Sequence, residues 1–410
     1  MAGVAGLRGT GDWGTDERPK NFREGILRFN PNGTAPIYAL TSKAGEKTVD
    51  DPEYNWWCEG NVLIRLQING SFVAGDTILV VDSADPTITT LGANLGTATN
   101  LKPGDILLVE PLADQATFNH ELVEVDNVIS DTQFSVRRGA GGTTAASIAD
   151  NQFLTVIGSA YAEGTGVPRA VSRNPIKNNN FIQIFKDTYE LTGTADETNT
   201  RTNNGYQEDK KRKSFKHASD IEWTIMFGRK AETTGDNGKP KRFAGGLREF
   251  IPTSNTTVFA SPVTPSTFLD ALAPTFDFDT GAGDQRIGFA GNLALIELSK
   301  IFANEVVFNV QGTVKNYGMD FTEFRLPNGT LMLKSHPLLS RHGLYRKSMF
   351  VCDFDAIKYV RQKNRPNGTP KDDVQAKDED VRRGYLQSDM GLMVDYGGLT
   401  QAYLGNISAT

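Results

Sequence analysis

The chain has 410 residues, of which 38% are hydrophobic and 22% are charged, and its formal net charge is −6. This composition excludes a disordered chain and a globally basic nucleic-acid-binding protein, although it leaves room for a local basic site. Cys58 and Cys352 form no CxxC pair, the N-terminus lacks the apolar core of a signal peptide, and no segment approaches the roughly 18 apolar residues of a membrane span. We therefore expect a chain that folds in a reducing cytoplasm.

Residues 1–35 form the first predicted segment, an N-terminal arm with five glycines in its first fourteen positions. The arm shows no sustained helical or strand periodicity. Such a segment cannot bury enough apolar surface to offset the entropy lost when it is ordered alone. Two interpretations stay open: a floppy tail, or an arm that folds against another subunit.

Extended β structure is predicted from residue 48 to residue 67, "TVDDPEYNWWCEGNVLIRLQ". Trp56 and Trp57 are adjacent in this segment. Because successive side chains of a strand point to opposite faces, the two rings cannot both enter the same core. We therefore expect that at least one of them contacts something else, and both are candidate inter-subunit contacts.

A unit of its own is predicted at residues 70–160, where "GDTILVVDSAD" is echoed by "GDILLVEPLAD" and further short strands follow. Repeated short strands separated by turn signals are typical of a small all-β barrel or sandwich. The unit contains 11 acidic residues against three basic ones, so its net charge is −8 and the rest of the chain carries +2. We expect this acidic insert to face away from any polyanion, because like charges would repel each other.

A long helix with two different halves is predicted at about 207–230 from its 3.6-residue periodicity. Its second half is apolar nearly all round and is expected to be buried. Its first half clusters five basic residues: Lys210, Lys211, Arg212, Lys213 and Lys216. Since cations near a helix N-terminus oppose the helix dipole, we expect anions to face them. The alternatives are acidic side chains of a neighbouring subunit, phosphates, or a solvated face, and we favour the subunit contact.

Further helices are predicted within 268–278 and 292–306, and strands within 348–360 and 391–407, on either side of a charged loop at 361–380. The architecture is therefore α+β with a β insert. No motif for chemistry emerges. "HELVE", which begins at His120, lacks the second histidine of a zinc site, and "DFDTGAGDQ" at 277–285 lacks the ligand spacing of a calcium loop. We predict no catalytic residue, no cofactor and no metal.

Several segments resemble the major capsid proteins of tailed bacteriophages, in the SU-ten-type branch with a large β insertion. They are "NGTAPIYAL", "YNWWCEG", "KPGDILLVE", "VRRGAGGTTAA", "NFIQIFKDTYELTGTA" and "DIEWTIMFGRK". The resemblance extends from about residue 21 to the C-terminus. It implies the Hong Kong 97-type capsid fold, which has an N-terminal arm, an extended hairpin, a peripheral domain with a spine helix, and an axial domain.

On this resemblance the extended hairpin comprises 36–69 and 161–185 and carries the insert. The peripheral domain comprises 186–255 and 345–410, and the axial domain 256–344. The implied function is that of a structural, non-enzymatic subunit that assembles in a bacterial cytoplasm into the hexamers and pentamers of an icosahedral virion shell around double-stranded DNA. Expected partners are other copies of the chain, cement or decoration, scaffold and portal proteins, and genome DNA at the inner face, but no membrane. The alternatives are another virion component, such as a tail or decoration protein, and a hydrolase with a site hidden in the sequence.

Overall fold

The computed structural model describes residues 35–58, 65–82, 97–110, 120–168, 170, 175–198, 204–278, 280–281, 283–302, 310–316 and 319–409. The predicted arm therefore lies outside the described residues, apart from its last position. Within the described ranges, no helix is long and apolar enough to cross a membrane.

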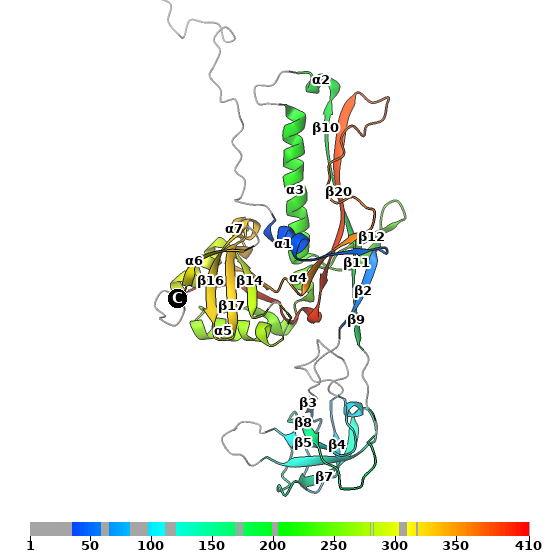
Figure 1. The fold of residues 1–410 in the computed structure, drawn as a ribbon, viewed down its shortest axis with the longest axis vertical. Helices are drawn as coiled ribbons and strands as arrows, with labels where there is room; N and C mark the ends of the chain where they lie inside the picture. Colours follow the sequence, from blue (N-terminus) through cyan, green and yellow to red (C-terminus); the bar gives the residue numbers. More distant parts are fainter. Residues whose placement is uncertain are drawn as a thin grey trace, which may run out of the picture.

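A long helix and a four-stranded sheet lie side by side in the upper part of Figure 1. The helix is α3 (Gly205–Phe227). The strand order of the sheet is β1 (Glu46–Val49), β19 (Ile357–Gln362), β20 (Val381–Val394) and β10 (Gln183–Thr192). β1 runs parallel to β19, and the other pairs are antiparallel. The short helix α2 (Gly193–Asp196) follows β10.

The predicted helix at 207–230 thus appears at almost the predicted bounds, and its apolar half is buried as expected. The helix begins after Asn204, whose side chain accepts a hydrogen bond from the Gln207 N–H at 3.2 Å. Ile221 and Ile225 lie one turn apart and are each 1% exposed. The ring of Phe185 on β10 meets the His217 ring of α3 edge-on, whereas Ile184 is exposed. The helix therefore covers one face of the sheet and leaves the face with Ile184 to solvent.

A seven-stranded sheet forms a second layer, with the helices α5 (Pro265–Leu272), α6 (Asn292–Phe302) and α7 (Pro337–Arg341) around it. Its strand order is β13 (Thr256–Val258), β21 (Ala402–Gly405), β18 (Met349–Cys352), β14 (Gln285–Ala290), β17 (Gly329–Ser335), β16 (Met319–Leu326) and β15 (Val310–Asn316). β13 pairs with β21 and β14 with β17 in parallel, and the remaining pairs are antiparallel. The predicted helices at 268–278 and 292–306 correspond to α5 and α6.

The C-terminal segment 345–410 divides between the two sheets, which differs from its expected return to the peripheral layer as one piece. β18 and β21 pair within the seven-stranded sheet, whereas β19 and β20 pair with β1 and β10. The two layers also share one hydrophobic core, to which α3 contributes Ile221, β10 contributes Phe185 and β14 contributes Phe289. A second core lies between the seven-stranded sheet and α5 and α6.

The segment expected to begin an extended hairpin at residue 36 begins instead with a helix, α1 (Pro36–Ala44). Ile37 and Leu40, three residues apart, are 0% and 1% exposed, and both belong to the core beside α3. Proline suits the first position of a helix, since the N–H that it lacks would have no partner there. The helical period therefore prevails over the extended conformation from residue 36 to residue 44.

Two small antiparallel ribbons project from these layers (Figure 1). One pairs β2 (Glu53–Cys58) with β9 (Ile176–Phe181), and the other is the hairpin of β11 (Ala231–Thr234) and β12 (Pro240–Phe243), which is followed by α4 (Leu247–Phe250). β2 occupies the central part of the extended segment predicted at 48–67.

The predicted β insert is a six-stranded antiparallel unit at the far end of the β2–β9 ribbon (Figure 1). Its order is β3 (Arg65–Gln67), β8 (Phe153–Ser159), β5 (Asp105–Val109), β6 (Leu122–Val128), β7 (Gln133–Ala140) and β4 (Ile78–Val80). A bridge between Ile68 and Val81 joins the two edge strands, so the sheet closes into a barrel around its own core. Because β3 belongs to this barrel, the unit begins by Arg65, earlier than the expected residue 70.

Candidate assembly surfaces

Strand β2 places its two adjacent tryptophans on opposite faces, as the alternation predicts. Trp56 is 4% exposed, donates its indole N–H to the Val394 carbonyl at 3.1 Å and stacks on Tyr54 with ring centroids 6.0 Å apart. Trp57 is 64% exposed. Trp56 therefore belongs to the core of its own chain, and only Trp57 presents its ring to the surroundings.

The basic half of α3 finds most of its anions within the same chain, some of them on the same helix and others in distant segments that the sequence did not indicate. Four of the five residues form ion pairs: Lys210 with Asp372 at 2.5 Å, Lys211 with Glu208 at 3.3 Å, Arg212 with Asp209 at 3.1 Å, and Lys216 with Asp187 at 3.4 Å and with Asp220. Lys213 forms no ion pair with another described residue. The side chains of Lys211 and Arg212 are still 68% and 54% exposed. Lys210 acts inside the subunit, whereas Lys211, Arg212 and Lys213 remain candidates for an external contact.

Asp372 ties the loop after β19 to the start of α3. Its Oδ1 accepts hydrogen bonds from the hydroxyls of Tyr189 at 2.8 Å and Tyr206 at 2.9 Å, and its Oδ2 accepts one from Lys210. The Lys210 ammonium lowers the pKa of Asp372. Burial, together with the carboxylate of Asp372, raises the pKa of Tyr206 to about 12. The loop is therefore held by a carboxylate that three donors share.

Glu222 occupies the apolar half of α3 and anchors helix α1. It is 0% exposed, and its two oxygens accept the backbone N–H groups of Ile37 at 2.9 Å and Tyr38 at 2.8 Å. These are among the first N–H groups of α1, which have no partner inside that helix, and the cap residue Ala35 supplies no side-chain acceptor. Glu222 thus caps α1 from another helix.

His336 completes this buried network from the seven-stranded sheet. It is 0% exposed, and its Nε2 lies 2.7 Å from Oε1 of Glu222. The Leu339 N–H donates to Nδ1 at 3.3 Å, so Nδ1 is the acceptor and the ring proton on Nε2 points to Glu222. One carboxylate thereby connects α3, α1 and the start of α7. The available signal in the sequence was a glutamate between Ile221 and Trp223 in an otherwise apolar turn.

Three side chains between α3, β10 and β20 have the spacing of a hydrolase triad, and two of them, His217 and Ser388, are buried. His217 Nδ1 lies 2.9 Å from Asp187 Oδ2, and His217 Nε2 lies 2.9 Å from Ser388 Oγ. Ser388, however, is 0% exposed in the middle of β20, paired with Phe185 on one side and Asn367 on the other. A nucleophile must reach its substrate, and this serine is enclosed on both sides. The array therefore joins the helix to the sheet.

The two motifs that superficially suggested metal sites belong to a strand and a turn. Among the described residues, no group of three or more histidine, cysteine or acidic side chains is placed to hold a metal ion. "HELVE" leads into strand β6. At "DFDTGAGDQ", the guanidinium of Arg286 donates to the carbonyls of Thr275, Phe278, Gly283 and Gln285. An arginine that is 1% exposed thus satisfies the carbonyl oxygens of this turn.

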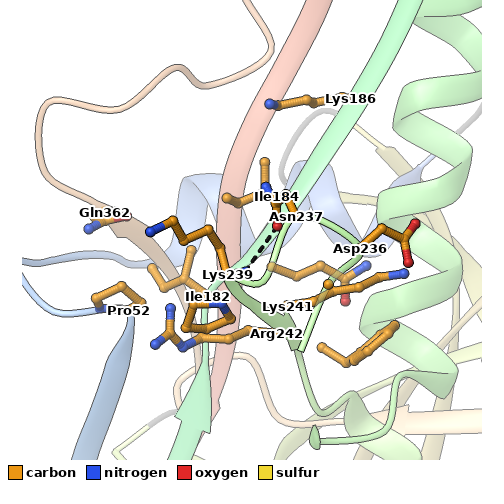
Figure 2. Close-up of a pocket in the computed structure, with 14 residues that line it drawn as sticks. Pro52, Ile182, Ile184, Lys186, Asp236, Asn237, Lys239, Lys241, Arg242 and Gln362 are labelled. Carbon is orange, nitrogen blue, oxygen red and sulfur yellow. Dashed lines mark hydrogen bonds between the residues drawn. The ribbon is translucent and has the colours of Figure 1, made fainter. Parts of the chain in front are cut away.

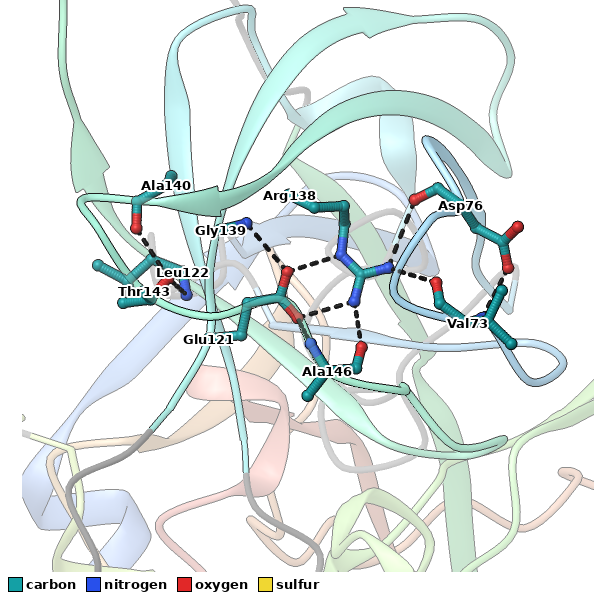
Figure 3. Close-up of polar contacts among 9 residues, drawn as sticks. All are labelled: Val73, Asp76, Glu121, Leu122, Arg138, Gly139, Ala140, Thr143 and Ala146. Carbon is teal, nitrogen blue, oxygen red and sulfur yellow. Dashed lines mark hydrogen bonds and ion pairs between the residues drawn. The ribbon is translucent and has the colours of Figure 1, made fainter.

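The barrel is organised around one buried ion pair (Figure 3). The Arg138 guanidinium binds both oxygens of Glu121 at 2.7 Å and also donates to the carbonyls of Val73, Asp76 and Ala146. Burial alone would raise the pKa of Glu121, but hydrogen bonds from Arg138 and from the N–H groups of Ala146 and Gly139 lower it below its usual value. Part of the acidity of the insert is therefore structural.

A surface groove of about 650 Å³ lies between the exposed face of β10 and the β11–β12 hairpin (Figure 2). Four basic side chains line it: Lys186, Lys239, Lys241 and Arg242. Asp236 is the acidic residue of the lining, and Ile182, Ile184 and Pro52 are among its apolar residues. The groove was not predicted, because its basic residues come from segments about 50 positions apart in the sequence.

Comparisons with known proteins identify the family of the chain. The family model described as SU10 major capsid protein matches residues 6–397. A major capsid protein of Pseudomonas phage PaMx41 is 30% identical over 357 residues, which cover 84% of this chain and 79% of that protein.

Solved structures resemble the chain at much lower identity. A structure from Microbacterium phage Oxtober96 is 9% identical in sequence, and the alignment covers 95% of this chain and 96% of that one, with a TM-score of 0.44. The capsid of an empty GTA particle is 9% identical, with coverages of 96% and 97% and a TM-score of 0.45. The family match over nearly the whole length decides the identity: the chain belongs to the SU10 major capsid protein family.

Proposed function

We propose that copies of this chain assemble through hexamers and pentamers into a closed icosahedral shell around a double-stranded DNA genome. The observation that carries the proposal is the family match over residues 6–397. As a capsid protein, the chain is a component of the virion, and we place its assembly in the cytoplasm of the bacterial host. Scaffold, portal and cement or decoration proteins are the partners that such a shell would recruit, and genome DNA would meet its inner face without sequence preference.

The two sheets, the ribbon and the barrel can each be assigned to one of the proposed domains. The sheet of β1, β19, β20 and β10 with α3 would form the peripheral domain, and the seven-stranded sheet the axial domain. The ribbon of β2 and β9 would be the extended hairpin, with the barrel as its insertion. The proposed role is structural rather than enzymatic, in keeping with the complete burial of Ser388.

Exposed side chains on the ribbon and on α3 are the proposed contacts between copies. Trp57 presents a large ring to solvent, and aromatic side chains are enriched at the centres of protein interfaces. Lys211, Arg212 and Lys213 would meet acidic groups of a neighbour. Trp56, Lys210 and Lys216 would act indirectly. Trp56 is buried, the Lys210 side chain is only 22% exposed and holds Asp372, and Lys216 already pairs with two carboxylates, Asp187 and Asp220.

The two tryptophans offer a matched test of this proposal. Trp57→Ala should change the stability of the subunit by no more than about 0.5 kcal/mol, as is usual for exposed positions, yet reduce the yield of shells. Trp56→Ala should cost about 3–5 kcal/mol, because it empties a core site. Reversing Lys211 and Arg212 to glutamate should also weaken assembly. Salt at 1 M should weaken assembly of the wild-type protein in the same way, because the Debye screening length falls to about 3 Å.

Sedimentation and negative-stain electron microscopy of the purified protein would measure the yield of shells, and denaturation the stability. A wild-type protein that stays monomeric under all assembly conditions and is absent from virions would refute the proposed function. Normal shells from the Trp57→Ala or the charge-reversed protein would refute only the corresponding contact.

A further inference from the structure

The groove beside the β11–β12 hairpin has the anatomy of a protein-binding surface. Its floor includes Ile182 and Ile184, and Ile184 is 53% exposed although it is a large apolar residue of strand β10. Basic side chains stand around this floor (Figure 2). An apolar centre with a charged rim is the usual arrangement of a protein interface.

The positive charge of the groove is mostly unneutralised. Arg242 pairs with Glu232 at 2.7 Å, and the Lys241 ammonium lies 5.4 Å from the centre of the Phe243 ring. Neither Lys186 nor Lys239 forms an ion pair with any other described residue. The surface is thus built for an anionic partner, and it differs from the basic half of α3, where four of five cations already have acidic partners.

The barrel carries the complementary charge. Of its carboxylates, Glu110, Glu121 and Asp126 are held by arginines, and Asp105 lies beside Lys102. Five other described carboxylates of the barrel make no ion pair with a described residue: Asp76, Asp82, Glu124, Asp131 and Asp150. The negative charge of the insert is therefore partly structural and partly free.

Groove and barrel lie at opposite ends of the same ribbon. Pro52 in the groove immediately precedes β2, and Ile182 immediately follows β9, whereas the barrel follows the other end of β2 (Figure 1). The ribbon is six residues long, which corresponds to about 20 Å. A basic surface and an acidic surface at separate places on one molecule suit a head-to-tail contact, in which each copy offers its barrel to the groove of the next and a ring can close.

We propose that this groove binds the carboxylate-rich surface of the inserted barrel of a neighbouring copy. The inference rests on the proposed shell function and assigns one of its contacts. DNA fits the groove less well, because phosphates would meet an apolar floor and the carboxylates of Asp236 and Glu232. A neighbouring barrel would instead place carboxylates on the basic rim.

Zero-length carbodiimide cross-linking of assembled wild-type shells tests the contact directly. The reagent joins an amine to a carboxylate only when the two touch. Shells assembled from equal amounts of ¹⁴N- and ¹⁵N-labelled protein should yield hybrid peptides that join Lys239 or Lys241 to Asp131 or Asp150. If these lysines link only to carboxylates of their own copy, or never to the barrel, the proposal is wrong.

Charge reversal tests whether the contact is needed for assembly. The double variant Lys239→Glu/Lys241→Glu should raise the lowest protein concentration that yields shells by about ten-fold or more, since like charges then face each other at every repeat of the contact. Adding Asp131→Lys and Asp150→Lys to the same chain should restore assembly. The control is Lys300→Glu/Lys377→Glu, which makes the same change in net charge at two exposed lysines outside the groove.

Each other outcome has a distinct meaning. Shells that form normally from the groove variant overturn the proposal and leave the capsid function intact. Normal empty shells that retain less DNA overturn it in favour of a nucleic-acid contact. A wild-type chain that forms no shells refutes the proposed function itself.

Discussion

Replacing Glu222 with glutamine should loosen helix α1 from α3 while the rest of the fold persists. The wild-type carboxylate accepts three hydrogen bonds in a fully buried place, from the N–H groups of Ile37 and Tyr38 and from Nε2 of His336. Glutamine keeps the size of the side chain, but one of its two terminal groups is an amide NH₂, which donates and cannot accept. At least one of the three donors must therefore lose its acceptor.

An unsatisfied buried donor costs about 1–3 kcal/mol. A whole domain has a free energy of unfolding of about 5–15 kcal/mol, which exceeds this cost. The substitution should therefore increase local opening rather than unfold the chain. We expect it at α1, whose first N–H groups have Glu222 as their acceptor. Alanine at this position would strand all three donors and leave a cavity, so it risks global unfolding and is the less informative variant.

Hydrogen exchange read by mass spectrometry in peptides from 36–44 is the suitable assay. A loss of about 2 kcal/mol corresponds to exchange about 30-fold faster, at 1.36 kcal/mol for each factor of ten. Asp220→Asn is the matched control. It removes a carboxylate from the same helix, and the Asp220 side chain is 43% exposed and pairs with no described residue other than Lys216. Exchange at α1 that is equal in the two variants, with both in the same assembly state, would refute the anchoring role of Glu222.

Two pH effects follow from the other polar networks. The pKa of Glu121 is lowered in the folded barrel, so its ionised form contributes stability that is present above the unfolded value of about 4.3 and is lost as the pH falls through the lower folded value. Peptides of β6 and β7 should therefore lose protection from hydrogen exchange in acid, after correction for intrinsic exchange rates. Glu121→Gln should remove most of this pH dependence of protection. The pKa of Tyr206 is raised to about 12 in the folded chain. The protonated hydroxyl therefore contributes its full stabilisation of the fold below pH 10, and this stabilisation is lost as the pH rises through 12. The loop at 363–380 should become sensitive to protease between these values, and Tyr206→Phe should shift that onset; an onset unchanged by the substitution would argue against the role of this hydroxyl.

Features with a strong local period were predictable from the sequence. The predicted helix at 207–230 matches α3 within three residues at either end, because its apolar stripe repeats every 3.6 residues. The opposite orientations of Trp56 and Trp57 follow from the strand period of two. The resemblance also predicted the capsid protein family, and the family match over residues 6–397 confirms it.

Features that depend on long-range pairing were not predictable. β18 and β21 join the seven-stranded sheet, and no local pattern specifies the partner of a short apolar strand. Lys210 finds its anion in Asp372, 162 positions away. The cluster on α3 was expected to face acidic groups of a neighbour or phosphates, whereas four of its five members pair with carboxylates of their own chain. Helix α1 was missed because its capping carboxylate lies 185 positions from Ile37.

The difference between satisfied and unsatisfied polar groups indicates where this chain needs a partner. A buried polar group must find its hydrogen bonds within the fold, since leaving one unmade costs more than the bond itself contributes. Glu222, Arg286 and Arg138 accordingly have several partners each. At the surface water can replace a partner, so nothing in the monomer requires Lys239 to be paired or Trp57 to be covered. Selection on the monomer alone would therefore leave no reason for an exposed tryptophan on a ribbon that points away from the core, or for cations grouped around an apolar floor. A contact repeated in every subunit supplies such a reason, because a contribution too small to matter for one copy is multiplied around the closed shell.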